Sequence, residues 1–234
     1  MPLPPTSQLT AAEDSLPVAA LLAASGGFLD AFTYVAHGHV FANAMTGNVV
    51  LLGVYAATGN WTQSWRHVPP ILAFLLGVAA AQSIRLPQMH RWLPNPAVAA
   101  LSAEMAFLLA GGWLPDRFPS LPLVLGISFL AALQSSSFRL LEKWPYNSTM
   151  TTGNLRSLAE LPFEALSPGR RAEALRRARL LGIVCLAFLA GAVLGGICTL
   201  RLNNKALWAA DVLLFFAWLL VFRSARNLYK TSVH

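Results

Sequence analysis

Charged residues are scarce in this chain. They make up 12% of its 234 residues, whereas 56% are hydrophobic and the mean hydropathy is +0.54. Soluble domains carry about 25% charged residues, so this balance excludes an ordinary soluble fold. It predicts an all-α, polytopic membrane protein whose main partner is the lipid bilayer.

Other features are missing as well. The two cysteines, Cys185 and Cys198, lie on one predicted helix thirteen residues apart, so they cannot pair and do not have metal-ligand spacing. The Walker, dinucleotide, zincin and nucleophile-elbow motifs are absent, so we expect no enzyme activity, no cofactor and no metal. The net charge of +7 comes from basic residues between apolar runs, which argues against a nucleic-acid partner. Residues 1–16 contain no Lys or Arg, so the first apolar run is expected to remain as a helix.

Six apolar runs approach the length of a membrane span. They cover residues 18–36, 70–84, 96–113, 121–140, 180–200 and 206–222. Two shorter helices are predicted in addition, at 46–57 and 152–161. A basic stretch at 167–177 predicts a short amphipathic helix on the anionic cytoplasmic leaflet.

The chain contains an internal repeat. Residues 41–48 (FANAMTGN) return as 147–154 (NSTMTTGN), and both copies stand between apolar helices. Residues 72–77 (LAFLLG) match 186–191 (LAFLAG) at five of six positions. The repeat predicts two halves, 17–114 and 120–222, with a tail at 1–16 and a basic cytoplasmic tail at 223–234. Gly191 and Gly195, with Gly77 and Ala81 in the other half, are expected to let helices pack closely.

Two topologies fit the repeat. If the motif helices span the membrane, each half crosses four times and the halves are parallel. If the motif helices are re-entrant, each half crosses three times and the halves are inverted. The re-entrant topology places thirteen of the 17 Lys and Arg residues on one side, and the spanning topology places eleven there. We favour the inverted 3+3 arrangement, with about six spanning helices and a cytoplasmic C-terminus.

The two motifs are the candidate binding site. Thr, Gly and Asn favour a helix start, where free N–H groups and the helix dipole attract polar or anionic groups. The predicted substrate-binding residues are Asp30, Asn43, Thr46, Gly47, Asn48, Gln134, Thr152, Gly153 and Asn154. Two simpler interpretations remain open: the motif is a tight turn without a ligand, and Gln134 makes an interhelical hydrogen bond.

Three acidic residues fall within apolar runs. Asp30 lies past the middle of the first run, and Glu104 and Asp211 occupy matching places in the last run of each half. An acid in the membrane is costly unless it faces the protein interior, so all three are candidates for proton coupling. Alternatively, Asp30 caps a motif helix and Asp211 lies in the wet interface.

Segments 27–31 (GFLDA) and 40–48 (VFANAMTGN) resemble the YoaK-like family of bacterial multipass inner-membrane proteins of unknown function. Residues 130–134 (LAALQ) and the second TGN, at 152–154, are similar to that family's second half. Where the family tends to have Gln-Asn-Ala, this chain has Gln-Ser-Ser at 134–136. The resemblance implies a bacterial inner-membrane protein of about six helices and supplies no substrate.

These observations favour a secondary transporter or channel-like carrier for a small polar or anionic solute, bound between the two motif helices. The alternative is a non-transporting scaffold, sensor or accessory subunit, in which the repeat serves packing. Either type of protein is compatible with a homo-oligomer.

Overall fold

The computed structural model describes residues 12–86 and 95–231, so most of the predicted N-terminal tail and Arg91 of the charge comparison lie outside the described residues. Each of the six apolar runs and both predicted motif segments contains a helix, although the runs 96–113 and 121–140 extend two or three residues past the ends of their helices. The first half contains α1 (Leu16–Ala36), α2 (Met45–Ala57), α3 (Trp61–Trp65), α4 (Val68–Ile84) and α5 (Pro96–Gly111). The second half contains α6 (Ser120–Ser137), β1 (Leu140–Leu141), β2 (Trp144–Pro145), α7 (Thr151–Glu164), α8 (Arg171–Leu202), η2 (Asn203–Ala206) and α9 (Leu207–Thr231).

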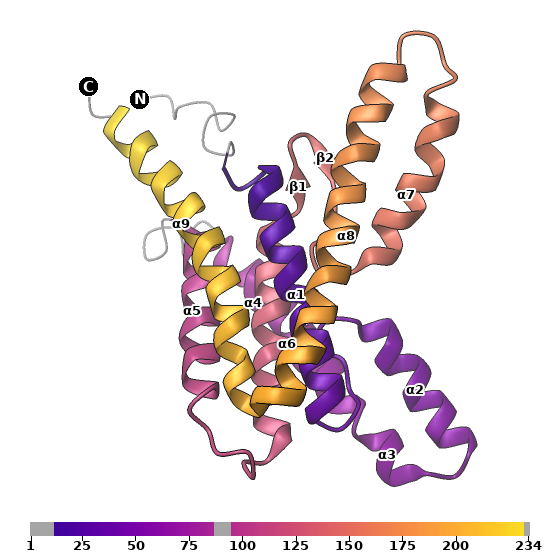
Figure 1. Cartoon of the computed structure of the whole chain (residues 1–234), viewed down its shortest axis with the longest axis vertical. Helices are drawn as coiled ribbons and strands as arrows, with labels where there is room; N and C mark the ends of the chain where they lie inside the picture. Colours follow the sequence, from indigo (N-terminus) through magenta and orange to yellow (C-terminus); the bar gives the residue numbers. More distant parts are fainter. Residues whose placement is uncertain (1–11, 87–94, 232–234) are drawn as a thin grey trace.

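Six long helices form a bundle (Figure 1), and its closest contacts join the two halves of the chain. Helix α1 packs mainly on α8, and α4 packs mainly on α6. Helix α5 contacts both α6 and α9, and α9 also contacts α1. Helices α2 and α3 leave the bundle at one end, and α7 forms a hairpin with the start of α8 at the other (Figure 1).

Glycines bring these helices into backbone contact. A Cβ added at Gly191 of α8 would lie 1.9 Å from the carbonyl oxygen of Ala24 in α1, and one at Gly195 would lie 2.5 Å from that of Phe28. A Cβ at Gly77 of α4 would lie 2.2 Å from the carbonyl oxygen of Phe129 in α6. The predicted close packing at these glycines is therefore confirmed.

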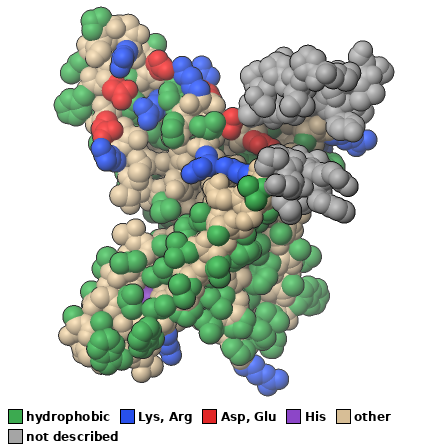
Figure 2. All heavy atoms as spheres, turned by 180° about the vertical axis from the view of Figure 1, so that it is seen from behind, with side chains coloured by type: hydrophobic (Ala, Val, Ile, Leu, Met, Phe, Trp, Pro, Cys, Tyr) green, Lys and Arg blue, Asp and Glu red, His purple; other side chains and the backbone are tan. Residues whose placement is uncertain are grey.

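Within residues 12–86 and 95–231, four helical stretches are long and apolar enough to cross a membrane. They are Leu16–Ala36, Trp61–Ile84, Ser120–Ser137 and Arg171–Arg226, the last of which runs through both α8 and α9. Helices α2 and α5 are shorter apolar helices. Figure 2 shows hydrophobic side chains over the surface of the bundle, whereas acidic and basic side chains gather at the end that carries the α7–α8 hairpin. The all-α polytopic membrane fold is thus confirmed.

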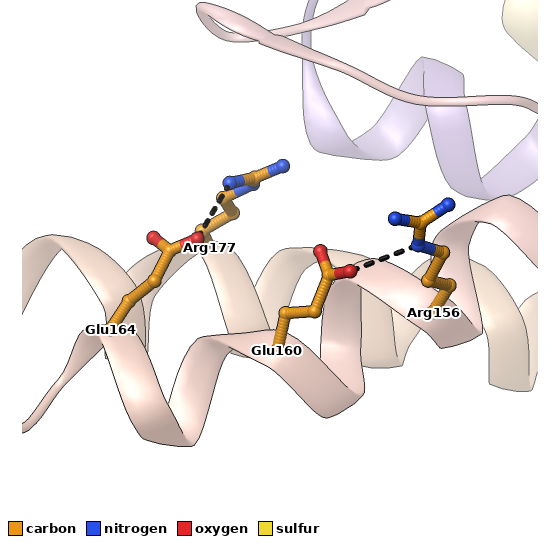
Figure 3. Close-up of polar contacts among 4 residues, drawn as sticks. All are labelled: Arg156, Glu160, Glu164 and Arg177. Carbon is orange, nitrogen blue, oxygen red and sulfur yellow. Dashed lines mark hydrogen bonds and ion pairs between the residues drawn. The ribbon is translucent and has the colours of Figure 1, made fainter.

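One predicted element is wrong. The basic stretch at 167–177 does not form a separate surface helix, because Arg171 begins α8 and this helix continues without a break to Leu202. The stretch instead pairs with α7 in the hairpin. An ion pair joins Arg177 of the stretch to Glu164 of α7 at 3.8 Å, and Arg156 pairs with Glu160 within α7 at 2.9 Å (Figure 3). Glu164 therefore neutralises part of the basic charge that suggested binding to a lipid surface.

Candidate functional site

The first motif turns back into the bundle after α1 ends at Ala36. The backbone N–H of Asn43 donates to Oδ1 of Asp30 at 2.7 Å, and the side-chain Nδ2 of Asn43 donates to the carbonyl of Gly26 at 3.1 Å. Gly26 is the central residue of α1, which spans Leu16–Ala36. Helix α2 therefore starts beside the middle of α1 and runs out towards the end of the bundle at which α1 ends (Figure 1).

The second motif reaches the same residue. A Cβ added at Gly26 would lie 3.3 Å from the carbonyl oxygen of Ser148 and 3.4 Å from Cα of Thr149. These residues immediately precede α7. The loops that lead into the two motif helices thus both contact Gly26, one through a hydrogen bond and one through backbone packing.

The last Asn of each motif makes the same pair of hydrogen bonds. In the first copy, Asn48 Nδ2 donates to the carbonyl of Phe41 at 2.7 Å, and the Phe41 N–H donates to Asn48 Oδ1 at 2.9 Å. In the second copy, Asn154 Nδ2 donates to the carbonyl of Asn147 at 2.7 Å, and the Asn147 N–H donates to Asn154 Oδ1 at 3.1 Å. Each amide closes its own loop, so both side chains hold the motif in shape.

The N–H groups that precede each motif helix are satisfied by side chains of the protein. Asp30 Oδ1 accepts from the N–H of Asn43 and, at 3.3 Å, from that of Ala44. In the second half, Asn147 Oδ1 accepts from the N–H of Thr149 at 3.0 Å and of Met150 at 3.1 Å. Asp30 therefore holds the loop immediately before α2, a structural role close to the capping expected for it, although it accepts from no N–H group of α2 itself.

Sequence reasoning missed Asn147. The signal was present, because an Asn side chain commonly bonds to the backbone N–H two residues further on. It also missed His67, whose Nδ1 lies 3.2 Å from Asn48 Oδ1 and helps to hold that amide.

The other predicted motif residues lie in different surroundings. Thr46, Thr152 and Gly153 are exposed, so they do not face the buried contact at Gly26. Gly47 has a steric role, because a Cβ there would come within 2.8 Å of the Phe41 ring. A substrate contact for these four residues stays a prediction.

Several buried polar atoms near the centre of α1 have no hydrogen-bond partner within the described residues. They include Asp30 Oδ2, Asn43 Oδ1 and Ser148 Oγ. Each belongs to a residue with at most 5% of its surface exposed. Buried polar groups are rarely left unpaired in proteins, so these atoms are the ones available to a bound solute, water or ion.

The second acidic site lies between α5, α6 and α9. Gln134 Nε2 donates to Glu104 Oε2 at 2.8 Å, which confirms the interhelical hydrogen bond expected for Gln134. Glu104 is 1% exposed, and its Oε1 has no partner in the described part of the chain. Asp211 lines a cavity of about 320 Å³ between α5 and α9 together with Ser102 and Trp218. The structure thus gathers two of the three predicted coupling acids on neighbouring helices, and Asp30 lies at the motif contact.

A helical bundle with an apolar surface and two matched chain breaks defines a polytopic α-helical membrane protein. The chain belongs to the family described as "Protein of unknown function (DUF1275)", whose profile matches residues 18–220. It is 25% identical over 211 residues to the UPF0700 transmembrane protein YoaK of Bacillus subtilis (strain 168), and the match covers 88% of this chain and 94% of that protein. No solved structure matches. The resemblance to a YoaK-like family is thereby confirmed, and with it a multi-pass bacterial membrane protein.

Proposed function

We propose that this protein is a secondary transporter or channel-like carrier that binds a small polar solute where its two motif loops meet at Gly26. The observation that carries the proposal is the pair of matched loops that reach the middle of α1. Beside them lie the unpaired polar atoms of Asp30, Asn43 and Ser148. Broken helices that meet in the core of the membrane are a common way to build a transport site.

An inverted 3+3 repeat is part of the proposal. In this repeat, three helices of the first half have equivalents in the second: α1 corresponds to α6, α4 to α8 and α5 to α9. The contact of α1 with α8 then corresponds to that of α6 with α4, and the contact of α1 with α9 corresponds to that of α6 with α5. The close approaches at Gly77 and Gly191 correspond in the same way. Helices α1 and α6 run in opposite directions, which supports inversion (Figure 1).

The ends of the bundle differ in charge, which supports a cytoplasmic C-terminus in the inner membrane. The end with the α7–α8 hairpin carries Arg85, Arg139, Lys143, Arg156 of α7 and the basic residues at the start of α8. The opposite end carries Arg66, Arg117, Arg201 and Lys205. Because Lys and Arg are more frequent in cytoplasmic loops, the hairpin end is the cytoplasmic end.

The polar atoms around Gly26 indicate which class of solute can bind there. Asp30 already accepts from the N–H groups just before α2, and the free atoms of Asp30 and Asn43 are acceptor oxygens, so a polar solute with hydrogen-bond donors fits better than an anion. Asp30 is also the first candidate for coupling to protons. Glu104 and Asp211 are the second, since two carboxylates on packed helices can share a proton. No catalytic role is proposed for any of these residues.

A non-transporting scaffold or sensor is the second candidate. It is favoured by the α7–α8 hairpin, which extends beyond the bundle (Figure 1) and exposes Phe163 to 75% and Leu166 to 81%. In this second function a partner protein docks on these two side chains, and the contact at Gly26 serves only to pack the helices.

A binding screen followed by uptake assays separates the two functions. Purified protein in lipid nanodiscs is screened by thermal shift against neutral and charged polar metabolites, because a bound ligand raises the apparent Tm. Each hit is then tested for uptake into proteoliposomes. We expect Asp30→Asn, which retains an oxygen that can hold the loop before α2, to reduce uptake at least about tenfold without a change in unliganded Tm.

The matched control is Asp116→Asn, which changes an exposed acid in the loop between α5 and α6. This variant should transport like the unmodified protein. Hits that are not taken up, or that Asp30→Asn transports at the unmodified rate, would refute the carrier and favour the scaffold.

A further inference from the structure

A cavity of about 570 Å³ opens at the end of the bundle opposite the α7–α8 hairpin. It lies between the turn after α1, helix α3 with the start of α4, and the start of α6. Its volume is in the range of small-molecule sites, about 300–1,000 Å³. The contact at Gly26 does not form part of its lining.

Among the described residues, one cation lines this cavity and no Asp or Glu does. The cation is Arg66, which takes part in none of the ion pairs between described residues. Its Nη1 lies over Gly38, 3.8 Å from the position that a Cβ on this glycine would take. A guanidinium without a carboxylate at the wall of a cavity is suited to bind an oxyanion, because its N–H groups match the geometry of a carboxylate.

Neutral hydrogen-bond donors accompany Arg66. His37 is only 5% exposed, its Nδ1 lies 3.1 Å from Ser120 Oγ, and its Nε2 has no hydrogen-bond partner among the described residues. Ser120 is the first residue of α6, and no side chain of the described chain caps this helix start. The free N–H groups of a helix start attract negative charge. The Nε2 atom of His37, buried and without a partner among the described residues, is an independent sign that a polar group binds at this cavity.

Charge and surface character specify the ligand further. Burial lowers the pKa of His37, which favours the neutral imidazole, and the full positive charge in the lining belongs to Arg66. A dianion would therefore be only partly neutralised. Trp65, Pro69 and Val124 form apolar walls, which suit a ligand with a hydrophobic body.

We propose that this cavity binds a small organic monoanion, a carboxylate with a short aromatic or aliphatic body, through Arg66, His37 and the start of α6. The site is distinct from the motif contact, so it stands whether or not the protein is a carrier.

The test uses benzoate as the anionic probe and benzamide as its neutral counterpart. Full-length protein in phosphatidylcholine nanodiscs is titrated with each by isothermal calorimetry at pH 7. We expect saturable binding of benzoate and at least about tenfold weaker binding of benzamide, because a hydrogen bond to a charged group is worth at least that much. Equal affinity for the two probes, or no saturable binding of benzoate, would overturn the proposal.

Three variants locate the binding. Arg66→Gln should weaken benzoate binding at least about tenfold, and Arg66→Lys should retain part of it because the charge remains. Arg201→Gln is the matched control, because this exposed arginine lies at the same end of the bundle and does not line the cavity. Unliganded Tm values show that each variant folds. If Arg66→Gln binds benzoate like the unmodified protein, or if Arg201→Gln loses as much affinity as Arg66→Gln, the assigned site is wrong.

Discussion

Two glycines of one helix should respond in opposite ways to the same substitution. Gly191 and Gly196 both lie in α8. A Cβ at Gly191 would lie 1.9 Å from the carbonyl oxygen of Ala24, whereas a Cβ at Gly196 would meet nothing within 4 Å. The two positions therefore separate the packing of α8 on α1 from the intrinsic helix preference of the residue.

The magnitude follows from the geometry. Gly191→Ala places an atom about 1.5 Å inside ordinary van der Waals contact with rigid backbone, so α1 and α8 must move apart. Overpacking of this kind costs about 1–3 kcal/mol. For a protein of this size the apparent Tm should fall by about 3–10 °C. Gly196→Ala should leave the Tm unchanged or raise it, because Ala in a helix interior is about 1 kcal/mol more favourable than Gly.

The assay is thermal unfolding of both variants in the same detergent, followed by loss of the monodisperse peak in size-exclusion chromatography. Gly182→Ala is a second control, because a Cβ there would also meet nothing within 4 Å. If Gly191→Ala unfolds at the same temperature as the two controls, α1 and α8 are not in backbone contact. The arrangement of the halves would then have to be revised.

Two further predictions concern the loops. Asn48→Ala should lower the apparent Tm because it leaves the Phe41 N–H and carbonyl without their partners, at a cost of about 1–3 kcal/mol. An unchanged Tm in the same unfolding assay would show that these two hydrogen bonds are not formed. Burial raises the pKa of Asp14 from 3.8 to about 6, so the ionised form costs stability as the pH rises through 6 and costs nothing below about pH 3.8. Asp14→Asn should therefore stabilise the protein at pH 8, by less than about 1 kcal/mol because the residue is partly exposed, and have no effect at pH 4. A difference in Tm of the same size at both pH values would contradict this reasoning.

Much of the fold could be predicted because a membrane-spanning helix requires a long apolar run that can be recognised in the sequence. A helix in lipid satisfies its own backbone and needs an apolar exterior, so the apolar runs marked α1, α4, α5, α6, α8 and α9. Gly77, Gly191 and Gly195 were likewise expected at close helix contacts, because only small residues permit them. The continuity of α8 from Arg171 into its apolar part was not predicted, since a basic amphipathic pattern is the same for a surface helix and for the exposed start of a longer one.

The site was predicted in part. Repetition of the motif located both helix starts, and the position of Asp30 between apolar residues marked it as buried and partnered. The sequence alone left open whether Asp30 caps α2 or binds a ligand. The local signal of Asn147 was present, but its role in the loop before α7 was not recognised.

Composition and the spacing of apolar runs by themselves determined the class of protein, its helices and the two related motifs, because these depend on transfer to lipid and on local backbone preference. Only the tertiary structure decided that both motif loops contact Gly26, that Asp30 holds the loop before α2, and that His37, Arg66 and the start of α6 line one cavity. These arrangements depend on which helices pack together across the two halves, and no local property of the chain specifies that pairing.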